Sequence, residues 1–456
     1  MSAVSTLSPG ARTFARGIHP NDNKQYAQDV AIEVLPTPGE VRVPLLQHLG
    51  APCEALVKPK TPVSMGDPIG QATGFVSAAV HASIDGVTAR VGAVTLPNGR
   101  HVAHVPIKAA EEQTLSGQAL FADILGGEWP SGDALKAWSA EQITEAASSA
   151  GLVGLGGATF PSHVKLARNE AKPIDTLLIN GCECEPYLTS DYRLMLEAPE
   201  AVVAGAQLAR AAIGARDLYL CVEDNKAPAA EALARALGSD ANTRVMLMKT
   251  KYPQGGEKQL IQAALKRSVP TGGLPLDVGV VVLNVGTCAA LARAVVRNKP
   301  LTHRVVSVTG GGIQSPKNVL APVGVSYQDL INFCGGMTDD AACVISGGPM
   351  MGFTLGDLSA PITKGTSGIT VLTHDETRKA SETACVRCGR CVDVCPLNLV
   401  PTRLAMAARY KDVALARRYH ISACMECGCC AYVCPASLPL VQLMRTGKIM
   451  VLKADK

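Results

Sequence analysis

The sequence is poor in aromatic residues, in net charge and in long apolar runs. Phe, Trp and Tyr make up 4% of its 456 residues, and the formal net charge is only +4. A charge this small does not indicate nucleic acid as a partner. The charge-free stretch 146–164 is long enough to span a membrane, but Ser, Gly and Pro161 interrupt it throughout. The sequence therefore predicts no membrane span.

Two further absences concern the compartment. Residues 1–17 lack the apolar core of a signal peptide, so secretion is not expected. Eight of the sixteen cysteines fit the spacing of two runs between Cys385 and Cys434, and the other eight show no paired framework. Unpaired thiols are typical of a reducing compartment. We therefore expect a chain that is cytosolic or lies peripherally on a membrane.

The two cysteine runs share the motif C-x-x-C-x-x-C-x-x-x-C-P. This is the bacterial ferredoxin arrangement for a [4Fe–4S] cluster, in which the fourth ligand comes from the other run when two clusters are present. Disulfides or zinc are alternatives, but neither needs two matching runs that each end in Pro. Cys429 is out of register and is interpreted as a bystander. We expect one cluster on Cys385, Cys388, Cys391 and Cys434, and the other on Cys424, Cys427, Cys430 and Cys395.

The first quarter of the chain predicts a small all-β unit. Short β-prone runs broken by Gly and Pro extend from Val30 to about Ile107, after a polar and irregular segment 1–30. Segments 63–70 and 80–87 resemble the sandwiched barrel of biotinyl and lipoyl carriers. No lysine that could carry the prosthetic group is evident at the turn 82–86, so we expect the scaffold without its swinging arm. The predicted strands are 31–35, 41–44, 87–94 and 101–107.

A glycine-dense loop, Gly151–Pro161, follows a predicted helix that begins near Ser139. Such a loop lets backbone N–H groups approach a phosphate or a flat ring, although alone it also fits a mere tight turn. A helix from His163 and a buried strand, 174–180, come next, which is the context of a nucleotide site. In the segment 180–187 that follows, two acids alternate with Cys182 and Cys184. A solvated turn is the alternative there.

The rest of the middle region alternates predicted helices with strands, which indicates a parallel sheet covered by helices. From Arg304 a mixed β and short-helix unit is predicted, and the polar stretch Thr363–Thr383 is interpreted as a tether to a mostly helical cysteine module. The predicted helices are 199–213, 227–237, 259–266, 289–297, 327–334, 399–407 and 412–420. The predicted strands are 217–222, 244–249, 278–284, 305–309, 318–325 and 342–346.

Together these motifs resemble the C subunit of Rnf ion-translocating oxidoreductases, from Gly17-Ile18-His19-Pro20 to the second cysteine run. The middle third is also similar to the NADH-binding flavoprotein subunit of respiratory complex I, whose G-x-G-G-A-x-F-P loop supports FMN and nicotinamide. The residues that match this loop are Gly154, Gly156, Gly157, Ala158, Phe160 and, later in the motif, Lys165.

Three shorter segments of that flavoprotein are matched only in part. Its N-x-D-E-x-E-P segment corresponds to Asn180, Glu183 and Glu185, with Cys182 in place of the aspartate. Its G-E-E turn corresponds to Gly256 and Glu257, after Gly255, with Lys258 in place of the second acid. Its N-N-V-x-T segment keeps Asn284 and Thr287. The resemblance implies that these residues bind the flavin and nicotinamide cofactors, with Glu183 and Glu185 as catalytic residues.

The resemblance implies a multidomain α/β fold in four parts. These are a β barrel-sandwich domain (1–125), a Rossmann-like domain for FMN and NAD(H) (126–300), a soluble-ligand-binding β-grasp domain (301–372) and a ferredoxin-type module with two [4Fe–4S] clusters (373–456). It also implies an enzyme subunit at the cytoplasmic face of the bacterial inner membrane, which couples electron exchange between ferredoxin and NAD to Na⁺ or H⁺ translocation. The expected partners are a ferredoxin-like B subunit and membrane-embedded subunits.

Two other functions remain as alternatives. One is a soluble flavin and iron–sulfur reductase, such as the cobalamin reductase of microcompartments, although the N-terminal barrel favours the Rnf interpretation. The other is an electron relay that has lost its nucleotide site, suggested by Cys182 and Lys258 where acids are expected. A basic run between Arg403 and Arg418 is interpreted either as a solvated helix face or as a docking surface.

Overall fold

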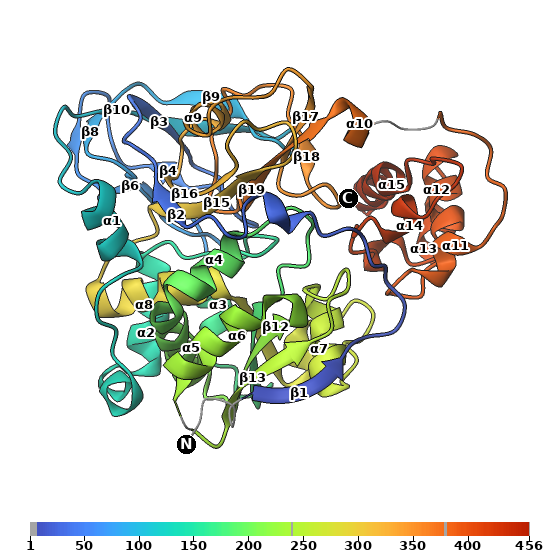
Figure 1. Cartoon of the computed structure of the whole chain (residues 1–456), viewed down its shortest axis with the longest axis horizontal. Helices are drawn as coiled ribbons and strands as arrows, with labels where there is room; N and C mark the ends of the chain where they lie inside the picture. The colour runs from blue at the N-terminus through green and yellow to red at the C-terminus, as the bar shows by residue number, and fades with distance from the viewer. Residues whose placement is uncertain (1–6, 239, 378–380, 456) are drawn as a thin grey trace.

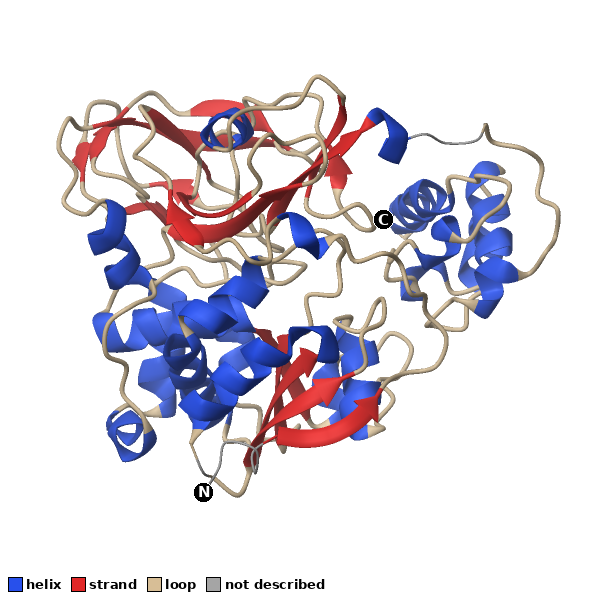
Figure 2. Cartoon of the chain, viewed as in Figure 1, coloured by secondary structure: helices blue, strands red, loops and turns tan. Residues whose placement is uncertain are grey.

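The structure is a computed structural model that describes residues 7–238, 240–377 and 381–455. Two β-rich parts lie side by side in the upper half of Figure 1, and a helix-covered sheet lies below them. A small helical module stands to the right, beyond the end of the β-rich half. Figure 2 shows that strands dominate the upper half, that strands and helices occur together in the lower part, and that the module on the right is helical.

The lower part is built on a parallel five-stranded sheet of order β1-β13-β12-β11-β14. Its carboxyl ends meet at one edge, where α/β proteins place their ligands. The strands are β1 (Leu7–Arg12), β11 (Thr176–Gly181), β12 (Asp217–Glu223), β13 (Thr243–Met248) and β14 (Val280–Asn284). The helices around it are α2 (Ala140–Ser149), α3 (Ser162–Leu166), α4 (Ser190–Glu197), α5 (Pro199–Ile213), α6 (Ala227–Leu237), α7 (Glu257–Leu265) and α8 (Val285–Arg297).

The predicted alternation of this region is confirmed, and two sequence features explain its packing. Ser139 caps α2 in a reciprocal pair with Gln142, as an N-cap and capping box should. Helices α5 and α8 pack backbone to backbone, because a Cβ at Gly205 would lie 1.7 Å from the carbonyl oxygen of Cys288. The small residues of α5 thus allow the two helices to approach each other closely.

Strand β1 differs from the prediction of an irregular N-terminus. Residues 7–12 pair in parallel with β13, with Leu7 opposite Val245. The segment contains Pro9 and Gly10, which weaken any strand signal, but an edge strand tolerates both because one side of its backbone needs no partner. Pairing with a distant strand therefore decides the conformation here.

The barrel-sandwich part confirms the predicted all-β unit. It consists of a β3-β10-β8-β5 sheet, with β9 on β10, and a β4-β6-β7 sheet. The strands are β3 (Glu40–Pro44), β4 (Glu54–Ala55), β5 (Pro62–Val63), β6 (Pro68–Gln71), β7 (Val80–His81), β8 (Gly86–Thr88), β9 (Gly92–Thr95) and β10 (His101–Ala109). Helix α1 (Gly117–Ile124) leads from it towards the lower part.

The second β-rich part is a six-stranded sheet of order β18-β17-β19-β15-β16-β2. The predicted strand 31–35 does not belong to the barrel, since β2 pairs in parallel with β16. The elements are β2 (Ile32–Val34), β15 (His303–Thr309), β16 (Lys317–Pro322), α9 (Tyr327–Phe333), β17 (Ala341–Ser346), β18 (Phe353–Thr354), β19 (Gly368–Thr373) and α10 (His374–Thr377).

The interpretation of Thr363–Thr383 as a tether is wrong for its first half. Strand β19 lies between β17 and β15 and buries five of its six residues. Ile369, Thr370 and Val371 are β-branched, which favours a strand even in a Thr-rich segment. Residues 378–380 of the predicted tether lie outside the described residues.

The C-terminal module is helical, as predicted, around the two cysteine runs. Its longest helix, α15, was not predicted. No helix in the described ranges is both long and apolar enough to cross a membrane. The helices are α11 (Arg390–Asp393), α12 (Pro401–Arg409), α13 (Val413–Arg418), α14 (Cys429–Tyr432) and α15 (Leu440–Ala454).

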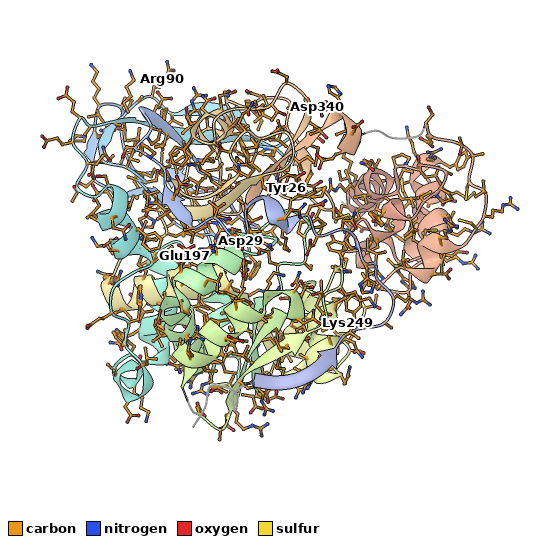
Figure 3. All side chains as sticks on the ribbon, in the orientation of Figure 1. Tyr26, Asp29, Arg90, Glu197, Lys249 and Asp340 are labelled. Carbon is orange, nitrogen blue, oxygen red and sulfur yellow. The ribbon has the colours of Figure 1, made fainter. Side chains whose placement is uncertain are left out.

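An N-terminal strap, residues 12–31, connects β1 of the parallel sheet with β2 of the six-stranded sheet. From β1 it runs past the cysteine module and then between the upper and lower halves (Figure 1). Tyr26 stacks on Tyr187, with ring centroids 5.9 Å apart. Just beyond the strap, Ile32 donates its N–H to Glu197 of α4 at 3.0 and 3.1 Å. Tyr26, Asp29 and Glu197 mark this boundary in Figure 3.

A buried ion pair at the carboxyl end of β12 gives a stability prediction. The side chains of Lys226 and Glu223 are each 2% exposed and lie 3.0 Å apart. Removing one partner leaves the other charge buried and unpaired, which costs about 3–5 kcal/mol. We expect Lys226→Met to lower the free energy of unfolding by that amount, measured in urea through the fluorescence of Trp129 and Trp138, which pack on the core of this part.

The control for this prediction is Lys136→Met, because Lys136 forms an ion pair that is exposed on both sides. It should leave the unfolding curve unchanged. The double change of Lys226→Met with Glu223→Gln should recover part of the loss, since no buried charge then remains unpaired. Equal unfolding curves for Lys226→Met and the unchanged protein would show that the buried pair of Lys226 and Glu223 does not stabilise the fold.

Candidate active site and cysteine cavity

The glycine loop forms an open cradle at the carboxyl edge of the parallel sheet. Its ends are closed by the N–H of Gly154 donating to the Phe160 carbonyl at 2.9 Å. Gly156, Gly157 and Ala158 are exposed, and a Cβ at Gly157 would meet nothing within 4 Å. A Cβ at Gly156 would instead lie 2.7 Å from the side chain of Asn284. The cradle therefore fits a flat or phosphorylated group that approaches the backbone closely.

The start of α8 lies directly behind this cradle. The Asn284 side chain accepts from the N–H of Gly286 at 2.8 Å and donates to Asp191 at 2.6 Å. The hydroxyl of Thr287 accepts from the N–H of Leu155 at 3.0 Å. Asn284 and Thr287, both predicted as site residues, thus hold the glycine loop against the N-terminus of α8, which carries a partial positive charge.

Lys165 and Glu257, which were both predicted to bind the cofactors, form an ion pair with each other. The Lys165 ammonium lies 2.9 Å from the Glu257 carboxylate and 3.2 Å from the Val282 carbonyl. Both side chains are about one-third exposed. This pair connects α3, which follows the glycine loop, with the start of α7. The ammonium group of Lys165 therefore lies beside the cradle.

The loop after β11 contacts the turn before α7. Asn180 donates to the Gly255 carbonyl at 2.8 Å, and the N–H of Gly255 points to the sulfur of Cys184 at 3.2 Å. Cys182 is fully buried and its thiol faces the Cys221 carbonyl at 3.7 Å. An aspartate at 182 would have to bury its charge beside apolar residues and near the Glu223 carboxylate, whereas a neutral thiol avoids both costs.

Glu183 and Glu185, predicted as catalytic residues, both bind backbone N–H groups. The Glu183 carboxylate accepts from the N–H groups of Asp191 and Tyr192, at 2.7 and 3.1 Å, and so caps α4. The Glu185 carboxylate accepts from the N–H groups of Met350 and Met351, at 2.7 and 3.0 Å. Burial raises the pKa of Glu185. Both acids anchor the loop to neighbouring elements.

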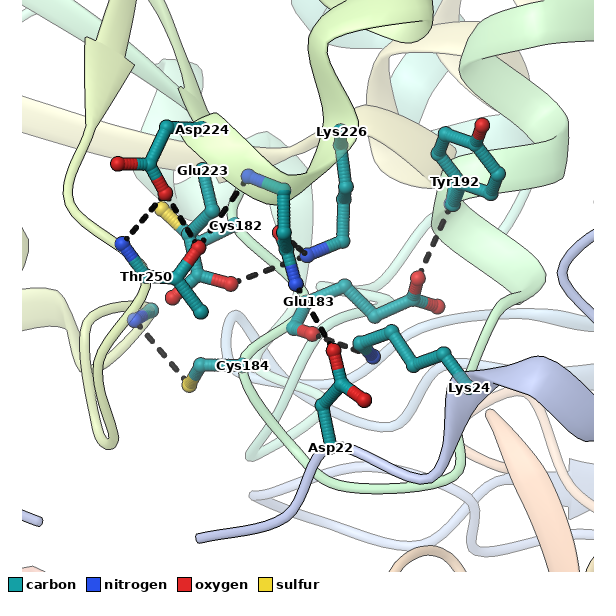
Figure 4. Close-up of polar contacts among 12 residues, drawn as sticks. Asp22, Lys24, Cys182, Glu183, Cys184, Tyr192, Glu223, Asp224, Lys226 and Thr250 are labelled. Atoms are coloured by element: carbon teal, nitrogen blue, oxygen red, sulfur yellow. Dashed lines mark hydrogen bonds and ion pairs between the residues drawn. The ribbon is translucent and has the colours of Figure 1, made fainter. Parts of the chain in front are cut away.

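Two buried ammonium groups lie under this loop (Figure 4). Lys24 of the strap donates to the carbonyls of Glu183, Glu185 and Leu188, at 2.9, 3.2 and 2.5 Å. Burial, and then the charge of nearby Lys226, lowers the pKa of Lys24. Because three carbonyls converge on one ammonium, the conformation of the loop depends on a residue far away in sequence.

The cysteines separate into two sets. Cys395, Cys424, Cys427 and Cys430, which we call the inner set, line one cavity. The outer set consists of Cys385, Cys388, Cys391 and Cys434. Burial, and then the charges of neighbouring Cys388, Cys434 and Cys385, raise the pKa of Cys391. Each set thus contains three cysteines of one run and the last cysteine of the other. This chemistry of four thiolates fits an iron–sulfur cube.

Cys429 also borders the inner cavity, and its thiol lies beside that of Cys427. It is 1% exposed and points to the carbonyl of Tyr252 at 3.9 Å. Exposure differs between the sets, since Cys385 and Cys388 are exposed while Cys427 and Cys395 are buried. The outer set therefore lies nearer to the solvent.

The inner set adjoins the predicted flavin face. The Tyr252 hydroxyl donates to the Cys427 carbonyl at 2.7 Å, and its backbone pairs with Ile18. A Cβ at Gly256 would lie 2.7 Å from the terminal carbon of Met425. One short turn thus contacts both the Asn180 loop and the cysteine run that begins at Cys424.

Several residues of this site were missed by the sequence analysis. Tyr252 and Lys24 carry no motif spacing, and their positions emerge only from contacts between distant segments. Asp191 and Arg304 border a second cavity, behind the glycine loop. Burial, and then the charge of Glu183, raises the pKa of Asp191, whereas burial lowers the pKa of Arg304 to about 10. The acidic first turn of α4 was the only available signal.

Models of four families match consecutive parts of the chain. They are described as the RnfC barrel sandwich hybrid domain (residues 12–112), the Nuo51 FMN-binding domain (147–293), the SLBB domain (305–354) and the 4Fe-4S dicluster domain (381–438). Their order matches the predicted architecture. They confirm the fold class and the expectation of FMN and [4Fe–4S] cofactors.

Three relatives decide the family. The C subunit of the proton-translocating ferredoxin:NAD(+) oxidoreductase complex of Clostridium ljungdahlii is 42% identical, over 87% of this chain and 84% of the relative. The chain belongs to the Rnf C-subunit family. The C subunit of the Na(+)-translocating complex of Acetobacterium woodii is also 42% identical, over 86% of each chain. That of the ion-translocating oxidoreductase complex of Rhodobacter capsulatus is 38% identical, over 98% of this chain and 85% of the relative.

The division of the cysteines into two sets predicts which cluster each cysteine substitution removes from this member of the Rnf C-subunit family. Cys395 belongs to the first run in sequence but to the inner set in space. We expect Cys395→Ala to remove the signal of the inner cluster in electron paramagnetic resonance and to lower bound iron from about eight atoms to about four. The matched control is Cys429→Ala, which should keep both clusters. Loss of the outer cluster alone in Cys395→Ala would contradict the shared ligation.

Proposed function

We propose that the chain is the NAD(H)-reacting peripheral subunit of a membrane complex that couples electron transfer between ferredoxin and NAD to Na⁺ or H⁺ translocation. The printed names of the two relatives at 42% identity support this reaction, one with protons and one with sodium ions. We further propose that the chain lies on the cytoplasmic face of the membrane. The other subunits of the complex would supply the membrane-spanning path.

The observation that carries the proposal is the turn 252–257. It contacts the glycine-loop face through Asn180 and the inner cysteine set through Tyr252 and Met425. FMN, when bound, supplies the link between a nicotinamide, which exchanges two electrons, and an iron–sulfur cube, which exchanges one. A site for two-electron chemistry and a site for one-electron chemistry therefore share one structural element.

The proposed role of each residue follows from its contacts. Gly154, Gly156 and Gly157 would let the flavin approach the backbone, and Phe160 would provide an aromatic face. Lys165 and the start of α8, with Asn284 and Thr287, would offset phosphate charge. Ala158, Gly255, Gly256 and Glu257 complete the rim of the site. We propose that Glu183 and Glu185 act by holding the Asn180 loop in place.

The two cysteine sets give the electron path a direction in space. The inner set adjoins the flavin face, whereas two cysteines of the outer set, Cys385 and Cys388, are exposed beside Val386. Residues 381–456 contain eleven Lys and Arg against five Asp and Glu. We propose that an acidic, ferredoxin-like B subunit docks near the outer set and exchanges electrons with it. Opposite charge would speed and orient that association.

The proposed reaction predicts a simple spectroscopic result. In the purified protein under anaerobic conditions, NADH should bleach the visible absorbance of bound flavin at roughly 1–1000 per second, the range usual for enzymes. The bleaching should be followed by reduction of the clusters. If flavin and clusters are bound but NADH causes no bleaching, the assignment as a dehydrogenase is wrong.

Lys165 provides a test of the flavin site itself. We expect Lys165→Ala to weaken FMN retention roughly tenfold, since a charge-assisted contact to phosphate is lost, while the iron content stays the same. Flavin fluorescence after gel filtration and iron analysis would measure the two quantities. Lys172→Ala is the matched control, because Lys172 pairs with Asp277 on the exposed surface of the same part. Loss of iron without loss of flavin would contradict the domain assignment.

A further inference from the structure

Phe75, in a loop of the barrel-sandwich domain, is exposed and yet fixed in position. Its side chain is 71% exposed. The carbonyl oxygen of Phe75 accepts a hydrogen bond from Nε2 of His163 at 3.0 Å. The two rings meet edge to face, at 6.0 Å and 88°. Single exposed apolar side chains are common, so the meaning of Phe75 depends on what lies beside it.

This aromatic lies next to the glycine loop. His163 is in the first turn of α3, three residues after Phe160 and two before Lys165. A second barrel loop also reaches the glycine loop, since the N–H of Leu49 donates to the Thr159 carbonyl at 3.4 Å. Leu49 is 43% exposed. The barrel thus places two exposed apolar side chains beside the open cradle.

The two barrel loops are braced against each other, so the position of Phe75 is well defined. The N–H of Ala51 donates to the Val76 carbonyl at 3.0 Å. The Thr73 hydroxyl donates to the Pro52 carbonyl at 2.7 Å. Rigid support of this kind lowers the entropy lost when a ligand is bound.

An exposed aromatic ring beside the cradle fits one half of a dinucleotide. Its nicotinamide must face the flavin, whereas its adenine is a second flat ring that gains from stacking on an aromatic side chain. Phe160 stands at the end of the glycine loop and is half-buried. Phe75 is the exposed aromatic of the barrel loop that touches α3, so it provides a second ring outside the sheet domain.

We propose that Phe75 stacks on the adenine ring of NAD(H), so that the barrel-sandwich domain forms one wall of the dinucleotide site. His163 is the positioning residue that holds the Phe75 loop. This inference rests on the proposed function, because it assigns the adenosine half of the same substrate. It gives the barrel domain a part in substrate binding.

The test compares ligands with and without the adenine ring, in the complete protein loaded with FMN and clusters. Phe75→Ala should raise the Kd for ADP-ribose and the KM for NADH by roughly 5- to 100-fold, the range for loss of one stacked base. Reduced nicotinamide mononucleotide has no adenine, so its KM should stay unchanged. Bound FMN should also stay unchanged. Phe75→Trp should retain tight binding of ADP-ribose.

Val87→Ala is the matched control, since Val87 is an exposed apolar residue on β8 of the same domain. It should leave every one of these constants unaltered. An unchanged Kd for ADP-ribose in Phe75→Ala would overturn the inference. Equal losses for NADH and reduced nicotinamide mononucleotide, or loss of FMN, would also overturn it, since they would indicate distortion of the site. If neither NADH nor reduced nicotinamide mononucleotide reduces the unchanged protein, the proposed function itself fails.

Discussion

The contact on which the rest of the site depends is the hydrogen bond from the Tyr252 hydroxyl to the Cys427 carbonyl, at 2.7 Å. Tyr252 is 1% exposed, so water cannot compete for this bond. The same residue pairs its backbone with Ile18 of the strap, and three residues later Gly255 bonds to Asn180. The flavin face and the inner cysteine set are therefore held at a fixed separation by one buried side chain and one short turn.

Buried charge gives this junction its rigidity. Lys24 satisfies three carbonyls of the loop above it, and Lys226 pairs with Glu223 at the end of β12. Burying an ammonium is costly unless all of its partners are in place, so each cation permits essentially one arrangement of the loop. A preorganised loop suits a site that must align two cofactors and a substrate. The two glutamates predicted as catalytic residues serve the same end, since both carboxylates bind backbone N–H groups.

Local patterns could be predicted from the sequence, and long-range pairings could not. Cysteine spacing and βα alternation are properties of neighbouring residues, and both appear in the structure as expected. Strands β1, β2 and β19 were missed or misplaced because their partners, β13, β16 and β15, lie elsewhere in the chain. Within the site, Asn180 and Gly255 could be found from motifs. Tyr252, Lys24 and Phe75 could not, because each acts through a contact between distant segments.

The strap explains why these distant contacts occur together. It starts at the end of β1, which belongs to the parallel sheet, and passes the cysteine module, where the N–H of Gly17 donates to the Val394 carbonyl at 3.0 Å. The chain then adds β2 to the six-stranded sheet. Gly17 has a φ of 77°, and a Cβ there would lie 2.6 Å from the Tyr252 carbonyl. Only glycine fits without moving the junction. The geometry of Gly17-Ile18-His19-Pro20 is thus required by packing between the flavin face and the cysteine module, and exposed His19 need not bind any ligand.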